Sequence, residues 1–301
     1  MPDSAPAEAL LAEARTITEA RLREVAARLE RITPAPMGPA LAYALGTAGK
    51  RVRPALVLAC FRAAGGTDDE IAGLATAVEI IHTYSLVHDD LPCMDDDPRR
   101  RGRPTTHVVF DGATATRVGY LLVPVAIEAL CQSTAALGVP AGTRQSIGRV
   151  LLAASGIQGM VGGQWLDLKA EGRALVADQL TDIHRRKTGA LIEAACVVGG
   201  LAAGAASPVL EALAGYGREI GLAFQVADDV LDATSTTAQL GKTAGRDASL
   251  QKSTYVSFLG VEGARAEGAR LAGRAVAWLE RAGLQSPSLV SLAHYIVNRQ
   301  S

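Results

Sequence analysis

Aromatic residues are scarce in this 301-residue chain, and charges of neither sign predominate. Only 4% of the residues are aromatic, and the formal net charge is −1 at pH 7. A near-neutral chain has no general electrostatic attraction for nucleic acid or for an anionic membrane, so we expect neither as a partner. Any anionic ligand must therefore be held by local clusters of cations.

The cysteines are also few, and they are too scattered for a disulfide framework or a cysteine metal site. They lie at positions 60, 93, 131 and 196, and no CxxC pair occurs. The N-terminal residues lack a cationic segment followed by an apolar core, and Gly, Ser and Pro interrupt the longest charge-free stretch, 194–210. We therefore expect a cytoplasmic protein with reduced thiols and no stable membrane insertion.

Runs that alternate apolar and polar residues, the pattern of a half-buried strand, are missing as well. Apolar residues instead recur at three- and four-residue spacing in 9–31, 71–88 and 180–195, which is the helical period. Breaks rich in Gly and Pro separate such segments, but no linker is long enough to divide the chain. With 49% hydrophobic residues, the sequence predicts one all-α domain, 1–301, built as a bundle of about ten or more helices.

Two aspartate clusters interrupt otherwise apolar helices. Their carboxylates are Asp89, Asp90 and Asp95 in the first cluster, and Asp228, Asp229 and Asp232 in the second. Asp228 and Asp232 are four residues apart and share a helix face. Asp89 and Asp95 are six apart, so Pro92 must end the helix near Asp90 and let a turn bring Asp95 back. Oxygen-only ligand sets of this kind suit Mg²⁺ that is shared with substrate phosphates.

Cations accompany both clusters, as a diphosphate site requires. They occur in GKRVRP, directly after the first aspartate cluster, in KTG and in GKT, and they are Lys50, Arg53, Arg99, Arg100, Arg101, Lys187 and Lys242. His82 lies seven residues before Asp89 on the same helix face, about 10 Å along the axis. Guanidinium forks and lysine charges at helix ends are the usual ligands of phosphate groups. The sequence therefore predicts binding of a magnesium diphosphate.

Motifs along the whole chain resemble those of the isoprenyl diphosphate synthases, and most closely those of the bacterial farnesyl diphosphate synthases. They are GKRVRP, EIIH, HDDLPCMDDDPRRRGRPTTH, GGQWLDL, HRRKTGAL, AFQVADDVLD, GKTAGRD and KSTY, and the similarity extends from about residue 40 to residue 299. The resemblance implies a helical bundle around a deep central cavity and a homodimer. It also implies two aspartate motifs that face each other and bridge three Mg²⁺ ions to an allylic diphosphate.

The same resemblance implies a role for individual side chains. The principal metal ligands would be Asp89, Asp95 and Asp228, supported by Asp90, Asp229 and Asp232. The allylic diphosphate would be held by Arg100, Lys187 and Lys242, and isopentenyl diphosphate by Lys50, Arg53, His82 and Arg101. Residues that line the reaction centre would be Thr188, Gln225, Gln164 and Asp167, with Arg299 as a candidate lid cation. Catalysis would depend above all on Asp89, Asp95, Asp228, Lys187 and Arg100.

These groups suit one reaction. When the allylic C–O bond breaks, Mg²⁺ and cationic side chains can stabilise the negative charge that develops on the departing diphosphate. The alkene of isopentenyl diphosphate then attacks the carbocation, and a proton is lost. No nucleophilic Ser or Cys is needed, but water must be excluded. The sequence therefore predicts a short-chain prenyltransferase.

Two residues before the first aspartate motif are expected to set the length of the product. Ser85 lies one turn before Asp89 on nearly the same face, and Tyr84 lies about 7 Å before it. A small Ser85 lets the growing tail pass, and a bulky Tyr84 would then form the floor. We therefore expect farnesyl diphosphate, made through geranyl diphosphate. A plain core role for Tyr84 and a geranylgeranyl product are the alternatives.

The chain departs from the family pattern at a few positions. Gly119-Tyr120 stands where relatives usually have Gly-Asp, Thr234-Ser235 stands where they often carry a Gly-Asp pair, and Pro98 replaces a commonly acidic residue. None of these positions is among the expected metal ligands. They put local packing and the level of activity in doubt rather than the reaction.

Three other functions use similar parts. A class I terpene cyclase ionises an allylic diphosphate but needs no second diphosphate site, which would leave Lys50 and Arg53 unexplained. A regulatory subunit of a heteromeric synthase typically loses one aspartate cluster, and both are present here. A di-iron bundle needs ExxH pairs on two helices, and this chain offers only the pair Glu79 and His82.

Overall fold

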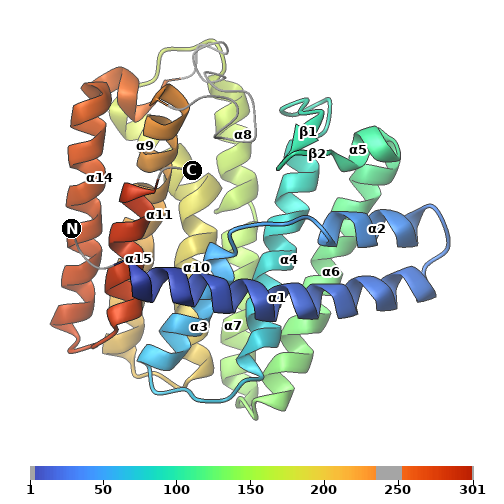
Figure 1. Ribbon diagram of the computed structural model, residues 1–301, viewed down its shortest axis with the longest axis horizontal. Coiled ribbons are helices and arrows are strands. Elements are labelled where there is room, and N and C mark those ends of the chain that lie inside the picture. The colour runs from blue at the N-terminus through green and yellow to red at the C-terminus, as the bar shows by residue number, and fades with distance from the viewer. Residues whose placement is uncertain (1–3, 235–252, 300–301) are drawn as a thin grey trace.

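The computed structural model describes residues 4–234 and 253–299, and these are mostly helical (Figure 1). The helices are α1 (Ala5–Ile32), α2 (Met37–Leu45), α3 (Val52–Ala63), α4 (Ile71–Asp89), α5 (Thr106–Val109), α6 (Gly112–Ala136), α7 (Ala141–Ser155), α8 (Met160–Ala170), α9 (Ala177–His184), α10 (Ala190–Ala202), α11 (Ser207–Thr234), α14 (Tyr255–Arg281) and α15 (Pro287–Asn298). A π-helical segment, η1 (Arg185–Gly189), joins α9 to α10. The predicted all-α fold is confirmed.

A small hairpin is the one sheet in the described residues. Strand β1 (Arg99–Arg100) pairs in an antiparallel manner with β2 (Arg103–Pro104). The two residues between the strands, Arg101 and Gly102, have φ values of 52° and 78°. Positive φ at both central positions is typical of the tight turns that join hairpin strands. Strands of two residues are too short for any alternation in sequence, so the sequence pattern does not reveal them.

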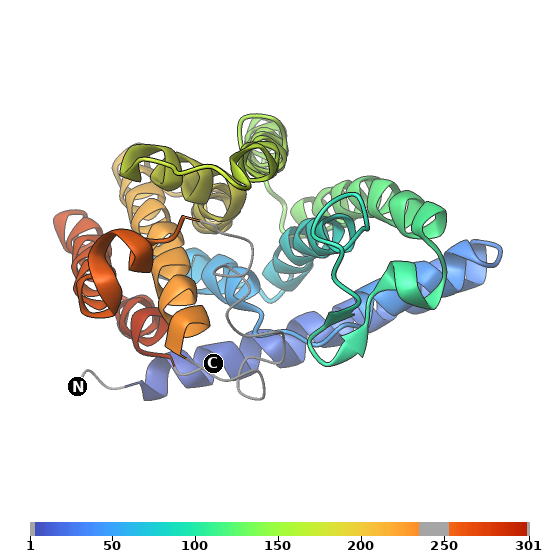
Figure 2. The same cartoon turned by 90° about the horizontal axis from the view of Figure 1, so that it is seen from above.

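Helices α3, α4, α10 and α11 form the centre of the bundle. The apolar residues of α3 and α4 are almost completely buried, as expected for helices that are hydrophobic on all sides. Helix α4 packs against α6, α10 against α3 and α11, and α11 against α14 (Figure 1). Helices α14 and α6 lie toward opposite ends of the longest axis (Figure 2). The central helices are therefore positioned by neighbours on several sides.

Helix α1, which has 28 residues, contacts helices in different parts of the bundle. It crosses in front of other helices in Figure 1 and runs along one side of the molecule in Figure 2, and it packs against α2, α3, α4 and α15. The main hydrophobic core accordingly includes Leu10 and Leu11 of α1 together with Leu292 and Ile296 of α15. A single domain of residues 1–301 remains a prediction.

The longest charge-free stretch of the sequence does not form a single helix. The charge-free stretch 194–210 is divided between α10 and α11 by a turn at Gly204, where φ is 72°. Within the described residues, one helix, α6, is long and apolar enough to cross a membrane. Core helices of soluble proteins meet the same criterion, and α6 packs along α4. All four cysteines lie in the described residues and are free thiols.

Candidate active site

The first aspartate motif begins where α4 ends. The helix stops at Asp89, and Asp90 caps it, as Pro92 predicts. The backbone N–H of Asp95 then donates to the carbonyl oxygen of Asp89, with an N···O distance of 2.9 Å. This turn brings Asp95 back beside Asp89, so the predicted local geometry is confirmed. Their role as metal ligands remains a prediction.

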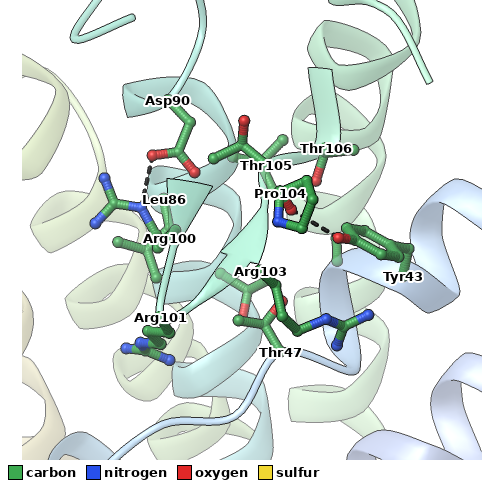
Figure 3. Close-up of a pocket in the computed structure, with 13 residues that line it drawn as sticks. Tyr43, Thr47, Leu86, Asp90, Arg100, Arg101, Arg103, Pro104, Thr105 and Thr106 are labelled. Carbon is green, nitrogen blue, oxygen red and sulfur yellow. Dashed lines mark hydrogen bonds and ion pairs between the residues drawn. The ribbon is translucent and has the colours of Figure 1, made fainter. Parts of the chain in front are cut away.

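Burial perturbs the carboxylates of this motif. It raises the pKa of Asp89 to about 6, against the opposing effect of the Lys187 ammonium. It also raises the pKa of Asp90 to about 6, although Arg100 acts in the opposite direction. Arg100 Nε donates to Asp90 Oδ1 at 2.6 Å (Figure 3). A cation placed beside Asp89 would relieve the unfavourable burial of its charge.

Lys187 approaches the first motif from the π-helical segment η1. Its Nζ lies 2.6 Å from Asp167 Oδ2 of α8. Burial alone would lower the pKa of Lys187, but Asp167, Asp89 and Asp95 together raise it, so the ammonium is charged. Helix α8 can come this close because residue 163 is glycine, and a Cβ there would lie 2.2 Å from the backbone nitrogen of Lys187. Segments far apart in sequence thus meet at one charged cluster.

Gln164 adds an unsatisfied polar group to the same region. It lies on α8, one turn before Asp167, and only 6% of its surface is exposed. Neither its amide nitrogen nor its amide oxygen has a hydrogen-bond partner among the described residues. A buried amide without partners is unfavourable unless a ligand or water satisfies it. This agrees with the predicted position of Gln164 at the reaction centre.

A second group of basic residues lies around the start of α3 and in the hairpin, and two of its members, Arg53 and Arg101, are near His82. Burial lowers the pKa of Arg53 to about 10, and it also lowers the pKa of Lys50 and of Arg101. Burial and the nearby Arg53 and Arg101 hold the pKa of His82 well below its ordinary value, so its imidazole is neutral. Arg53 Nε and His82 Nδ1 have no hydrogen-bond partner in the described structure. We call Lys50, Arg53, His82 and Arg101 the cation pocket, and its chemistry suits an anion.

Arg51, which follows Lys50 directly, points elsewhere, and its role was not predicted from the sequence. Arg51 has a φ of 54°, a left-handed conformation that is uncommon for a residue with a side chain. Its Nη1 donates to Glu79 Oε1 at 2.7 Å, and both side chains are 2% exposed. Nη2 donates to the carbonyl oxygen of Thr47 at 2.7 Å. The buried pair ties the loop of the cation pocket to α4. Only the EIIH motif, with Glu79 three residues before His82, hinted at this.

The second aspartate motif lies near the end of α11, and its three carboxylates face different surroundings. Arg299 Nη2 donates to Asp228 Oδ1, and the Arg299 guanidinium carbon is 3.8 Å from the centre of the Phe224 ring. Arg299 therefore lies at the second motif, and its role as a lid cation remains a prediction. The adjacent Asp229 instead accepts the backbone N–H of Tyr255 at 2.7 Å, at the start of α14. Its supporting metal role remains a prediction, as does that of the buried Asp232.

The two motifs do not form a ready-made metal cage. Within residues 4–234 and 253–299, no three acidic, histidine or cysteine side chains converge on a point where an ion could be held. Magnesium usually takes only one or two protein carboxylates and completes its coordination with water and substrate phosphates. The arrangement is therefore compatible with metal that arrives with its diphosphate.

Two of the predicted arginines, Arg100 and Arg101, line a pocket behind the hairpin. It is lined by residues of α2, α4 and the hairpin, among them Tyr43, Thr83, Asp90, Arg100 and Arg101. Tyr43 Oη donates to the carbonyl oxygen of Pro104 at 2.6 Å, which fixes the hairpin against α2. Figure 3 shows the side chain of Arg103 pointing away from those of Arg100 and Arg101. The predicted deep central cavity remains a prediction.

The structure describes most of the other residues that were predicted to line the site. Thr188 in η1 and Gln225 in α11 are half-buried. Ser85 Oγ donates to the carbonyl oxygen of His82 at 2.8 Å, and Tyr84 is half-buried beside the core. Lys242, with the rest of GKTAGRD, lies outside the described residues. The departure at Ser235 lies outside them as well.

Comparison with known proteins decides the family. The family model described as polyprenyl synthetase matches residues 35–277. The chain belongs to the polyprenyl synthetase family. It is 45% identical over 271 residues to the farnesyl diphosphate synthase of Escherichia coli (strain K12), which covers 88% of this chain and 89% of the relative. It is 41% identical over 264 residues to the chloroplastic geranylgeranyl pyrophosphate synthase of Capsicum annuum, covering 87% and 71%.

A solved structure agrees with these sequence relatives. The geranyltransferase from Helicobacter pylori, complexed with magnesium and isoprenyl diphosphate, superimposes with a TM-score of 0.78 at 31% identity, covering 93% of this chain and 96% of that one. The predicted short-chain prenyltransferase is thereby confirmed, and so is its class, a transferase. A terpene cyclase would be a lyase and does not fit this family.

Proposed function

We propose that this polyprenyl synthetase makes farnesyl diphosphate, by condensing isopentenyl diphosphate first with dimethylallyl and then with geranyl diphosphate. The relatives named above include both farnesyl and geranylgeranyl synthases, so the family does not fix the product length. The observation that carries the proposal is Tyr84, a half-buried ring on α4 less than two turns before Asp89. The small Ser85 beside it lets a tail pass, and the Tyr84 ring stops the tail.

The allylic diphosphate would be bound between the two aspartate motifs with three Mg²⁺ ions. The half-buried Asp89, Asp95 beside it and the Asp228 carboxylate would supply oxygen ligands of the type that Mg²⁺ prefers. When bound, Mg²⁺ acts as a Lewis acid on the oxygens of the leaving group. Lys187 and Arg100, both charged, would bind the same diphosphate and stabilise its charge as the C–O bond breaks. Lys242 is proposed as a third cation on the sequence alone.

The second substrate would be bound in the cation pocket. Partial desolvation lowers the pKa of Lys50, Arg53 and Arg101, so a bound diphosphate would stabilise their charged forms. Neutral His82 can still donate a hydrogen bond to a phosphate oxygen. The Arg51–Glu79 pair holds the loop of Lys50 and Arg53 in place. Two diphosphate substrates would need two separate groups of cations, which explains why basic residues cluster at the site although the net charge of the chain is only −1.

Association into a homodimer is the second part of the proposal. Exposed apolar side chains occur on three consecutive helices, including Tyr120 and Leu121 of α6, Leu152 of α7 and Val161 of α8. Contact with a second copy in the cytoplasm would cover such side chains. Light scattering after size-exclusion chromatography measures the mass directly. A monomeric mass at micromolar concentration would contradict this part.

Product analysis tests the main proposal. Purified protein is incubated with Mg²⁺, dimethylallyl diphosphate and excess isopentenyl diphosphate, and the dephosphorylated products are identified by mass. Farnesol as the main product supports the proposal. Geranylgeraniol as the main product would keep the prenyltransferase and contradict the floor at Tyr84. A parallel incubation with excess chelator should give no product.

A further inference from the structure

Tyr120 places an aromatic ring at the contact between α6 and α4. Its side chain is 67% exposed, which is unusual for a ring of this size. The ring nevertheless contacts His88 of α4 edge to face, with ring centroids 5.3 Å apart and an angle of 85° between the planes. This geometry is the favourable one for aromatic pairs.

His88 is fixed between the two helices by more than this ring. Its Nε2 lies 3.0 Å from the carbonyl oxygen of Thr116, one turn before Tyr120. Because a carbonyl only accepts, Nε2 carries the proton. The imidazole also lies against the backbone of Gly119, where a Cβ would come within 1.9 Å of Nε2. The pair Gly119-Tyr120 thus provides both a gap for the imidazole and a ring beside it.

His88 also contacts Tyr84, the residue proposed to form the floor for the growing tail. Tyr84 contacts His88 edge to face, with centroids 5.2 Å apart and an angle of 78°. Three rings therefore stand in series across the interface of α4 and α6, in the order Tyr84, His88 and Tyr120. We call them the aromatic ladder. Tyr120 is the outermost member, and the proposed floor is the innermost.

We infer that Tyr120 is a specificity-determining residue, which acts through His88 to hold the Tyr84 ring in the path of the growing tail. The inference rests on the proposed function, since it requires Tyr84 to be the floor. A ring that is braced on one side by His88 resists displacement by a tail of fifteen carbons. Without Tyr120, the His88 ring loses its outer contact, and the Tyr84 ring can turn aside. Longer products should then escape the limit more often.

Product distributions of four variants test the ladder. Tyr84→Ala should move the main product to twenty carbons or more. Tyr120→Ala should raise the ratio of twenty- to fifteen-carbon product about fivefold, the effect of losing one aromatic pair. Tyr120→Phe keeps the ring and should leave the ratio unchanged. Leu121→Ala removes a neighbouring exposed side chain of α6 and should also leave it unchanged, which controls for altered association.

Two further readouts separate a positioning role from general damage. The rate of geranyl diphosphate formation should stay within about twofold of wild type in Tyr120→Ala, because the ten-carbon product does not reach the floor. The double variant of Tyr84→Ala and Tyr120→Ala should match Tyr84→Ala alone, because Tyr120 acts through Tyr84.

Each remaining outcome overturns the inference. If Tyr84→Ala lengthens the product but Tyr120→Ala does not, the ladder is wrong and the floor stands. If Tyr84→Ala leaves the length unchanged, the floor in the proposed function fails, and the inference fails with it. An equal shift in Tyr120→Phe or in Leu121→Ala would assign the effect to the hydroxyl or to association rather than to the ring.

Discussion

The two aspartate motifs have similar sequences, but their local structures differ. The first follows the end of α4, and a turn with a backbone hydrogen bond brings Asp95 back to Asp89. The second stays within α11, where helical geometry separates neighbouring residues by about 100°. Asp228 therefore meets Arg299, whereas Asp229 meets the start of α14.

A repeated motif therefore need not repeat its function residue by residue. In the first motif, both Asp89 and Asp90 have a raised pKa and a nearby cation. In the second, one carboxylate pairs with a cation near the C-terminus, and its neighbour accepts a hydrogen bond that stabilises a helix start. We therefore expect the first aspartate of each motif, Asp89 or Asp228, to be essential for turnover, and Asp229 to contribute mainly to stability.

The largest effect is expected at the leading residue of each motif. Asp89→Ala and Asp228→Ala should each lower kcat about a thousandfold or more, because an essential ligand of the metal that activates the leaving group is lost. Asp96→Asn is the matched control, since Asp96 lies in the first motif but is exposed. Steady-state assays with saturating Mg²⁺ measure the effect. Substantial turnover in either alanine variant would contradict the metal assignment.

The next effect concerns the stability of the metal-free protein. The pKa of Asp89 is raised from 3.8 to about 6, so its protonated form stabilises the fold fully below about pH 4. This contribution is lost as the pH rises through about 6, and a shift of this size corresponds to roughly 3 kcal/mol. Asp89→Asn, which stays neutral, should therefore raise the free energy of unfolding at pH 7 without Mg²⁺. Urea titrations at pH 5 and pH 7 measure the free energy of unfolding. If Asp89→Asn increased it equally at both pH values, the raised pKa of Asp89 would not be the cause.

A smaller effect should distinguish the two groups of cations. Arg101→Ala and His82→Ala should raise KM for isopentenyl diphosphate about tenfold and leave the allylic KM nearly unchanged. Lys187→Ala should affect the allylic substrate instead, since its Nζ lies with Asp167 and Asp89. Kinetics in which each substrate is varied separately give both constants. Equal losses for both substrates in all three variants would show that the cation pocket is assigned wrongly.

The smallest effect sharpens the comparison within the second motif. Asp229→Ala should lower the free energy of unfolding by about 1 kcal/mol, because the N–H of Tyr255 loses its acceptor. Asp229→Asn keeps a side-chain oxygen and should lose less. If Asp229→Ala abolishes turnover at unchanged stability, Asp229 is a metal ligand after all.

Part of the fold and of the candidate site could be predicted from the sequence, because local sequence determines those features. Pro92 ends α4 near Asp90 whatever surrounds it, and helical periodicity places α1 and α4. Periodicity should also have warned that Asp228 and Asp229 cannot face the same way. The conformation of Arg51, the π-helical turn at Lys187 and the two-residue strands leave no such local pattern. Tertiary contacts decide them, and so does the pairing of Arg51 with Glu79.

Metal binding in the presence of inorganic diphosphate tests the central claim most directly, namely that both motifs hold the metal diphosphate. Mn²⁺ replaces Mg²⁺, and electron paramagnetic resonance counts the bound ions in wild type, Asp89→Ala, Asp228→Ala and Asp229→Asn. Binding that depends on diphosphate should persist in wild type and Asp229→Asn and should be lost in both alanine variants. Equal metal binding in Asp89→Ala or Asp228→Ala would contradict the claim.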